Sequence, residues 1–445
     1  MKQHRNNRLS VAQRWAIVVV GIPLGFCLGC LLHQHSSSLL NGENGEADAE
    51  RNKVELNKVL TNDQCKVEGL EEMNKRIERY LTRWEIRGAS IAVSRGDSLV
   101  YAHGFGWADE EKKERMEPGH LLRVASVSKL LTAAGIMKLV EEGKLRLTDH
   151  VFGAHGVLND TAYTNVITDK RLLDITVEQL LRHKAGFTNG AGDPMFSTRI
   201  IMMQNKLSVP PDNRQLIRIV LRRRLGYTPG EGTKYSNFGY MLLSQIIEKR
   251  SGMPYEDFMQ RKLFHPAGCY DMHLARNYFE NKRPNEVRYY MHNTATPSPE
   301  FNNSGRMVVR CYGENDIERL NGAGGWCASA PELCRFIAAI DGRPGVKDVL
   351  SEQSVKAMTA DMHQEHAFSL GWNTTPDNGP WVRTGTLVGT SALVVVFPDG
   401  ECWVMITNTS TWRGHAFAKE TISFFDKIRQ KYAQQFPHRS LWPMN

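Results

Sequence analysis

The strongest constraint on the fold of this chain is that β-strand patterns lie near both ends of its folded part, whereas the residues between them have helical periodicity. Four strands forming two hairpins are predicted over residues 89–94, 98–105, 390–397 and 402–407. Because hairpins gain stability by sharing one core, we predict a single antiparallel sheet completed by both ends of the domain. Helices at about 67–84 and 416–433 are expected to flank it. The predicted fold class is α+β, with a mainly helical subdomain inserted at about 145–340 and a cleft where the two parts meet.

The first part of the chain has the pattern of a membrane anchor. Residues 15–32 carry no charge over 18 positions, which is long enough to cross a bilayer as a helix. Four basic residues precede this segment, and the first acidic residue, Glu43, follows it. The positive-inside rule then predicts a single-pass type II signal anchor, with residues 1–14 in the cytoplasm. A flexible stalk at 33–62 and a folded domain at 63–436 would lie outside the cytoplasm.

Two alternatives stay open for this segment. A cleaved signal peptide would release a secreted protein, and a basic, acid-free start is also found in mitochondrial targeting segments, which here would lead to the intermembrane space. Gly21, Gly25 and Gly29 form a small-xxx-small pattern, which is compatible with self-association through the membrane helix.

The charge of the chain does not point to nucleic acid. The net charge is +8 and the isoelectric point is about 9.0, but lysine and arginine are spread along the chain rather than gathered into one patch. Six cysteines lie outside the predicted span and are compatible with disulfides in an oxidising compartment. Four sequons predict a glycoprotein if the domain enters a secretory compartment. They are at Asn159, Asn302, Asn373 and Asn408.

The sequence Ser126-Val127-Ser128-Lys129 is the clearest chemical signal. It lies directly before a helical run from Leu130 to Glu142. At the first turn of a helix, Ser126 and Lys129 lie on one face and within reach of each other. The free backbone N–H groups at the helix N-terminus would stabilise a developing oxyanion. The pattern therefore predicts a nucleophilic serine.

A second element is Tyr235-Ser236-Asn237, which we expect in a loop before an amphipathic helix at 241–248. A tyrosine beside a cation can relay protons, because the cation lowers its pKa. An asparagine can orient a lysine or a substrate amide.

A third element is Arg383-Thr384-Gly385, which we expect to enter the strand that runs to Phe397. A cation, a hydroxyl and a glycine at a sheet edge would allow anion binding and a close backbone approach to substrate. The glycine-rich run 322–326 is expected in a loop near the same cleft.

With these three elements in this order, the chain resembles the serine β-lactamase and penicillin-binding-protein superfamily, in the branch of class C β-lactamases, esterases, D-aminopeptidases and animal β-lactamase-like proteins. The resemblance runs from about Gly88 to Asn408. It rests on residues 122–129, 142–145, 175–186, 229–240 and 385–400. The resemblance implies the α+β fold predicted above.

The resemblance also implies a role for each matching residue. Ser126 would be the acylated nucleophile, Lys129 its proton acceptor and Tyr235 a second acid/base. The backbone N–H groups of Ser126 and Thr386 would form the oxyanion hole. Substrate-binding roles fall on Asn237, Arg383, Thr384 and Gly385. The implied function is a serine peptidase or esterase acting on a small-molecule or peptide substrate, without a cofactor.

Arg383 departs from the family pattern, which usually has lysine or histidine before Thr-Gly. An arginine keeps the positive charge but cannot shuttle protons at neutral pH. We also find no counterpart of the glutamate that activates water in class A enzymes, so efficient antibiotic hydrolysis is not expected. These departures motivate the alternative of a catalytically weak or inactive binding or scaffold protein. No metal site is predicted, since His363 and His366 match neither zinc-protease motif.

Overall fold

The computed structural model describes residues 60–187, 192–292, 295–360, 368–411 and 415–442. The predicted anchor at 15–32 with its three glycines, the stalk up to residue 59, and His363 and His366 lie outside these ranges. None of the described helices is both long enough and apolar enough to cross a membrane.

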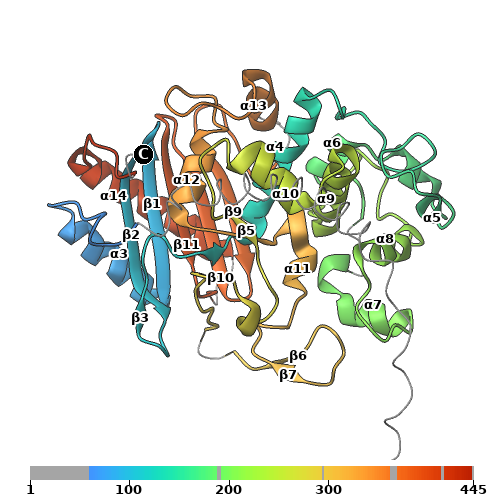
Figure 1. Cartoon of the computed structure of the whole chain (residues 1–445), viewed down its shortest axis with the longest axis horizontal. Coiled ribbons are helices and arrows are strands. Elements are labelled where there is room, and N and C mark those ends of the chain that lie inside the picture. The colour runs from blue at the N-terminus through green and yellow to red at the C-terminus, as the bar shows by residue number, and fades with distance from the viewer. Residues whose placement is uncertain (1–59, 188–191, 293–294, 361–367, 412–414, 443–445) are drawn as a thin grey trace, which may run out of the picture. The chain divides into compact units, whose positions relative to one another are not determined.

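Both ends of the folded chain pair within one six-stranded antiparallel sheet (Figure 1). Its strands are β1 (Gly88–Arg95), β2 (Ser98–Asp109), β3 (Glu114–Arg115), β9 (Trp381–Leu387), β10 (Thr390–Val396) and β11 (Glu401–Thr407). The order across the sheet is β3-β2-β1-β11-β10-β9. The two ends meet where β1 pairs with β11, from Ala89 opposite Thr407 to Arg95 opposite Glu401. The predicted sheet and the α+β class are confirmed.

Helices cover both faces of this sheet. Side chains point alternately to the two faces along each strand, and the central strands have apolar side chains on both, so both faces must be kept from water. On one face, Ile91 and Val395 pack with helices α3 (Glu71–Arg83) and α14 (His415–Tyr432). On the other face, Ala92 and Val394 join the main core, to which α12 (Ala330–Ala338) contributes. Although α12 lies within the predicted insertion, it packs on β1 and β11.

The remaining helices form the part of the molecule beside the sheet (Figure 1). They are α4 (Ser128–Glu141), α5 (Thr161–Thr164), α6 (Val177–Leu181), α7 (Thr198–Gln204), α8 (Asn213–Leu221), α9 (Asn237–Ser251), α10 (Tyr255–Met259), α11 (Ile317–Leu320) and α13 (Glu352–Thr359). Short strands join them, namely β4 (Leu122–Arg123), β8 (Trp326–Ala328) and β5 (His273–Leu274) in one sheet, and β6 (Ser298–Pro299) with β7 (Met307–Val308).

Helix α9 differs from its prediction in two ways. It begins at Asn237 rather than Met241, because the side chain of Ser236 caps it by accepting a hydrogen bond from the Gly239 amide at 3.1 Å. It is also not amphipathic, since its first two turns are buried on all sides. The reason is its central position, where α4, α6 and α10 pack around it.

The structure shows the surroundings of the six cysteines and of two of the sequons. All six cysteines of the folded part are buried and free of disulfides. Asn408 is fully buried, and its amide nitrogen donates to the carbonyl oxygens of Trp107 and Arg288 at 2.9 Å each. A glycan has no room there, so this sequon was wrongly predicted to be available. Asn159 is exposed.

Candidate active site

Ser126 lies in a single 3-10 turn, Ala125–Val127, which leads directly into α4. Ala125 has a φ of +48°, which is a strained value for a residue with a side chain. Strain of this kind is found where a fold holds a reactive side chain in an exposed turn, and Ser126 is half-buried beside the helix N-terminus. The backbone therefore holds Ser126 at the N-terminal end of α4.

Lys129, the second residue of α4, is completely buried, and its ammonium donates to a hydroxyl, a side-chain amide and a backbone carbonyl. The acceptors are Ser126 Oγ at 3.3 Å, Asn237 Oδ1 at 2.7 Å and the carbonyl oxygen of Ala323 at 2.5 Å. Burial lowers the pKa of this lysine, Arg383 lowers it further, and Tyr235 opposes the shift. A lysine with a lowered pKa is a better proton acceptor near neutral pH.

Tyr235 lies over the same lysine, with the ammonium 4.7 Å from the centre of its ring. Burial alone would raise the pKa of the phenol, but the charges of Lys129 and Arg383 and the hydrogen bonds with Lys129 and Ser126 lower it to about 8. At this pKa the phenol can both accept and donate a proton under physiological conditions.

Arg383 is 1% exposed on the edge strand β9 and contacts the protein rather than the open cleft. Its Nε donates to the backbone carbonyl oxygen of Ser126 at 2.7 Å, and its Nη2 donates to Tyr235 Oη at 3.2 Å. Arg383 therefore bonds to two parts of the site, the turn that contains Ser126 and the phenol of Tyr235. It places a positive charge beside both.

The rest of the third motif fixes β9 against the serine. The amide of Thr384 donates to Asn373 Oδ1 at 2.7 Å. A Cβ on Gly385 would lie 2.3 Å from the carbonyl oxygen of Val124 and 2.9 Å from the amide nitrogen of Ser126, so only glycine fits. The prediction that this motif enters the strand ending at Phe397 was wrong: β9 ends at Leu387, and a tight turn with Gly389 at a φ of +88° leads into β10.

Three groups at this site were missed by sequence reasoning. The first is the carbonyl of Ala323, which accepts from Lys129. The sequence predicted only that its glycine-rich run lies near the cleft. His183, inside one of the matching blocks, lies with its ring 4.3 Å from that of Tyr235, and its pKa is held well below the usual value by burial and by the nearby cations. Asp193, for which no sequence signal existed, is half-buried and accepts from the backbone amide of Asn237 at 2.5 Å. Burial raises the pKa of Asp193, and its charge in turn raises that of Lys129.

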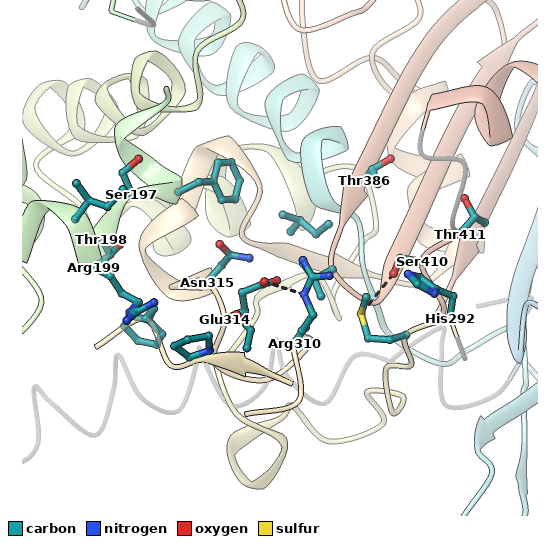
Figure 2. A pocket seen from close by; sticks show the side chains of 18 residues that line it. Ser197, Thr198, Arg199, His292, Arg310, Glu314, Asn315, Thr386, Ser410 and Thr411 are labelled. Atoms are coloured by element: carbon teal, nitrogen blue, oxygen red, sulfur yellow. Dashed lines mark hydrogen bonds and ion pairs between the residues drawn. The ribbon is translucent and has the colours of Figure 1, made fainter. Parts of the chain in front are cut away.

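A cavity of about 630 Å³ opens next to this group of residues (Figure 2). Thr386, exposed on β9, lines the cavity, whereas Ser126, Lys129 and Tyr235 do not. Figure 2 shows Thr386 on one side of the cavity and Ser197, Thr198 and Arg199 on the other. The side chains of the three sequence motifs, separated by more than a hundred residues at each step, therefore meet in one group, and the strand of the third motif borders a substrate-sized space.

A serine hydroxyl next to a buried lysine and a tyrosine of low pKa defines a nucleophilic serine site. The family model described as "Beta-lactamase" matches residues 73–423, and the chain belongs to this family of serine hydrolases. Penicillin-binding protein 4* of Bacillus subtilis (strain 168) is 28% identical over 327 residues, covering 71% of this chain and 66% of that protein. Protein flp of Staphylococcus aureus (strain N315) is 25% identical over 361 residues, covering 78% of this chain and 63% of that protein. The chain thus spans slightly less than two thirds of the length of these relatives.

Solved structures agree on the fold. The D-amino acid amidase from Ochrobactrum anthropi SV3, in complex with L-phenylalanine, matches with a TM-score of 0.61 and 21% identity, covering 81% of this chain and 99% of the amidase. The octameric penicillin-binding protein homologue from Pyrococcus abyssi matches with a TM-score of 0.60 and 20% identity, covering 82% of this chain and 79% of that chain. The predicted resemblance is confirmed at the level of family and fold.

Proposed function

We propose that this chain is a serine hydrolase that cleaves an amide or ester bond through an acyl-enzyme on Ser126. The observation that carries the proposal is the contact of the buried Lys129 ammonium with Ser126 Oγ at 3.3 Å, beside a tyrosine whose pKa is about 8. The relatives named as penicillin-binding proteins and as an amidase support amide bonds as one substrate type.

Each step of this reaction can be assigned to groups at the site. Neutral Lys129 takes the proton of the Ser126 hydroxyl as Oγ attacks the carbonyl carbon of the substrate. The resulting oxyanion accepts hydrogen bonds from the backbone N–H groups of Ser126 and Thr386. Tyr235 donates a proton to the departing amine or alcohol, and the acyl group stays on the serine as an ester. Asn237 orients the lysine from the opposite side, at 2.7 Å.

Deacylation reverses these proton transfers with water as the nucleophile. The Tyr235 phenolate, stabilised by Arg383, accepts a proton from water as the oxygen attacks the acyl carbon. Ser126 leaves with the proton held by Lys129, and the acid is released. Arg383 thereby supplies electrostatic stabilisation without itself transferring a proton.

The alternative of an inactive scaffold is less well supported. It was motivated by an arginine in place of a proton-shuttling residue and by the missing water-activating glutamate. However, Arg383 is one of the groups that lower the pKa of Tyr235, so the phenol can serve as the base for water.

The test is hydrolysis of a p-nitrophenyl ester by the full chain purified in detergent, with release of p-nitrophenol followed before the steady state. We expect an initial burst that equals the amount of enzyme. Ser126→Ala should abolish the burst, and Lys129→Met should slow it by orders of magnitude. Ser128→Ala is the matched control in the same motif, because Ser128 is fully buried and its hydroxyl accepts from the Trp326 amide at 3.2 Å. A burst that survives Ser126→Ala would refute the assignment.

We also propose that residues 15–32 anchor the protein in a membrane, with the folded domain outside the cytoplasm. The charge pattern around this segment supports the orientation. Alkaline carbonate should fail to extract the full chain from membranes, whereas a chain that starts at residue 63 should be released. Cell fractionation then shows whether the protein is at the cell surface, in mitochondria or in the medium, which separates the anchor from the two alternatives. Crosslinking of both forms tests whether Gly21, Gly25 and Gly29 cause self-association.

A further inference from the structure

The cavity beside Thr386 has walls of mixed character. Its apolar surface includes Phe301 and Leu387, which are buried, and Phe196 and Ile200, which are exposed at its opening. Phe196 and Ile200 belong to the segment at the start of α7, across the cavity from β9 (Figure 2). Together with Phe301 and Leu387, these side chains give the cavity an apolar side that can contact a nonpolar group.

The arginines and the glutamate that line the cavity bond to groups of the protein. Arg310 Nε donates to Glu314 Oε1 at 2.8 Å, and Figure 2 shows this pair within the cavity. Arg199, at the opening, donates from Nε to Asn303 Oδ1 at 3.1 Å. A substrate carboxylate would have to compete with these existing partners.

Arg383, on the strand that carries Thr386, also bonds to groups of the protein. Arg383 stands at the position from which the family resemblance implies substrate binding, but it is 1% exposed. Its guanidinium bonds to the Ser126 carbonyl oxygen and to Tyr235 Oη. It therefore stabilises the reacting groups and is poorly placed to hold a substrate carboxylate.

The side of the substrate that occupies the cavity follows from the proposed proton donor. Tyr235, which would protonate the leaving group, does not line the cavity, whereas Thr386 of the proposed oxyanion hole does. The leaving group therefore departs on the Tyr235 side, and the substituent that continues past Thr386 is the acyl group.

We propose that this cavity binds the acyl group of the substrate, and that this group is an uncharged, medium-length fatty acyl chain. The inference rests on the proposed acyl-enzyme at Ser126 and adds the substrate class to it. The cavity of about 630 Å³ is large enough for a whole acyl chain, since pockets of roughly 300–1,000 Å³ hold complete small ligands. Because Arg383 is bonded to the protein, the leaving amine or alcohol does not have to carry a carboxylate for it to bind.

The experiment compares p-nitrophenyl acetate, butyrate, hexanoate and octanoate with the full chain, each below its micelle-forming concentration. A fully buried methylene favours binding about fourfold. Because one side of the cavity is open, we expect kcat/KM for octanoate to exceed that for acetate by at least about tenfold. The mono-p-nitrophenyl ester of adipic acid, which ends in a carboxylate, should be hydrolysed more slowly than the hexanoate by a similar factor.

Two variants on one helix locate the effect. Ile200→Asp places a charge at the opening and should reduce the octanoate-to-acetate ratio of kcat/KM by at least about tenfold. Met203→Asp is the matched control, because Met203 is 68% exposed on α7 and does not line the cavity, and it should keep the wild-type ratio.

The outcomes separate this inference from the function on which it rests. Equal kcat/KM values for acetate and octanoate, with hydrolysis abolished by Ser126→Ala, would overturn the acyl-chain inference alone. Faster hydrolysis of the adipate ester than of the hexanoate would overturn it in favour of a carboxylate held by Arg310 or Arg199. Loss of the chain-length preference in Met203→Asp but not in Ile200→Asp would place the acyl group elsewhere. No acylation by any of these esters would refute the proposed function itself.

Discussion

Replacing Gly385 with alanine should nearly abolish acylation while leaving the protein folded. The added Cβ would lie 2.3 Å from the Val124 carbonyl oxygen, and a Cβ essentially never approaches another atom closer than 3.0 Å. The obstructing atoms belong to the backbone and cannot rotate away, so β9 and the turn of Ser126 must move apart by at least the difference between 2.3 and 3.0 Å. A displacement of this size at reacting groups costs on the order of a hundredfold in rate. Overpacking of this kind costs about 1–3 kcal/mol in stability.

The assay is the burst rate of ester hydrolysis, measured together with the thermal unfolding curve. Gly239→Ala is the matched control, because its Cβ would meet nothing closer than 3.7 Å although it lies in the first turn of α9. This variant should keep its acylation rate and gain up to about 1 kcal/mol in stability from helix propensity. A wild-type acylation rate in Gly385→Ala would refute the view that close contact between β9 and the serine turn positions the site.

Three further predictions concern charge and burial. Arg383→Gln removes a charge that lowers the pKa of Lys129 and of Tyr235, so the rise of kcat/KM with pH should move to higher pH. Asp193→Asn removes a charge that raises the pKa of Lys129, so the same rise should move to lower pH, and a shift in the opposite direction would contradict the assigned coupling. Tyr255→Phe removes the hydroxyl that accepts from the buried indole N–H of Trp326 at 3.0 Å. The free energy of unfolding, measured with denaturant, should fall by about 1–3 kcal/mol, and the pH dependence of kcat/KM should stay unchanged.

The sheet was predictable because its signals are local. Both hairpins have apolar strands and short turns at their centres, and one shared core is the simplest way to bury four such strands. The bounds of β9 were not predictable in the same way. Nothing in the pattern from Arg383 to Phe397 marks the turn at Gly389 apart from a single glycine, and the whole stretch reads as one strand.

The residues of the site also differ in whether the sequence predicts them. Ser126, Lys129, Tyr235 and Asn237 carry motif spacings that the family resemblance identifies. Asp193 carries none, because its place next to the Asn237 amide depends on how the chain before α7 packs against the start of α9.

The role of Arg383 could not be read from sequence either. The sequence specifies a positive charge before Thr-Gly, but only the packing shows that the guanidinium points back to the Ser126 carbonyl oxygen rather than into the cleft. The same holds for Asn408, whose sequon is indistinguishable from an exposed one until its burial is known.

The most direct measurement of the central claim is peptide mapping by mass spectrometry after the full chain has reacted with a fluorophosphonate. Cleavage after Arg123 and after Lys129 gives one peptide that contains both Ser126 and Ser128. We expect a single adduct per chain, located by fragmentation on Ser126 and absent from Ser126→Ala. An adduct on Ser128 or on any other residue, or no adduct at all, would contradict the assignment of Ser126 as the nucleophile.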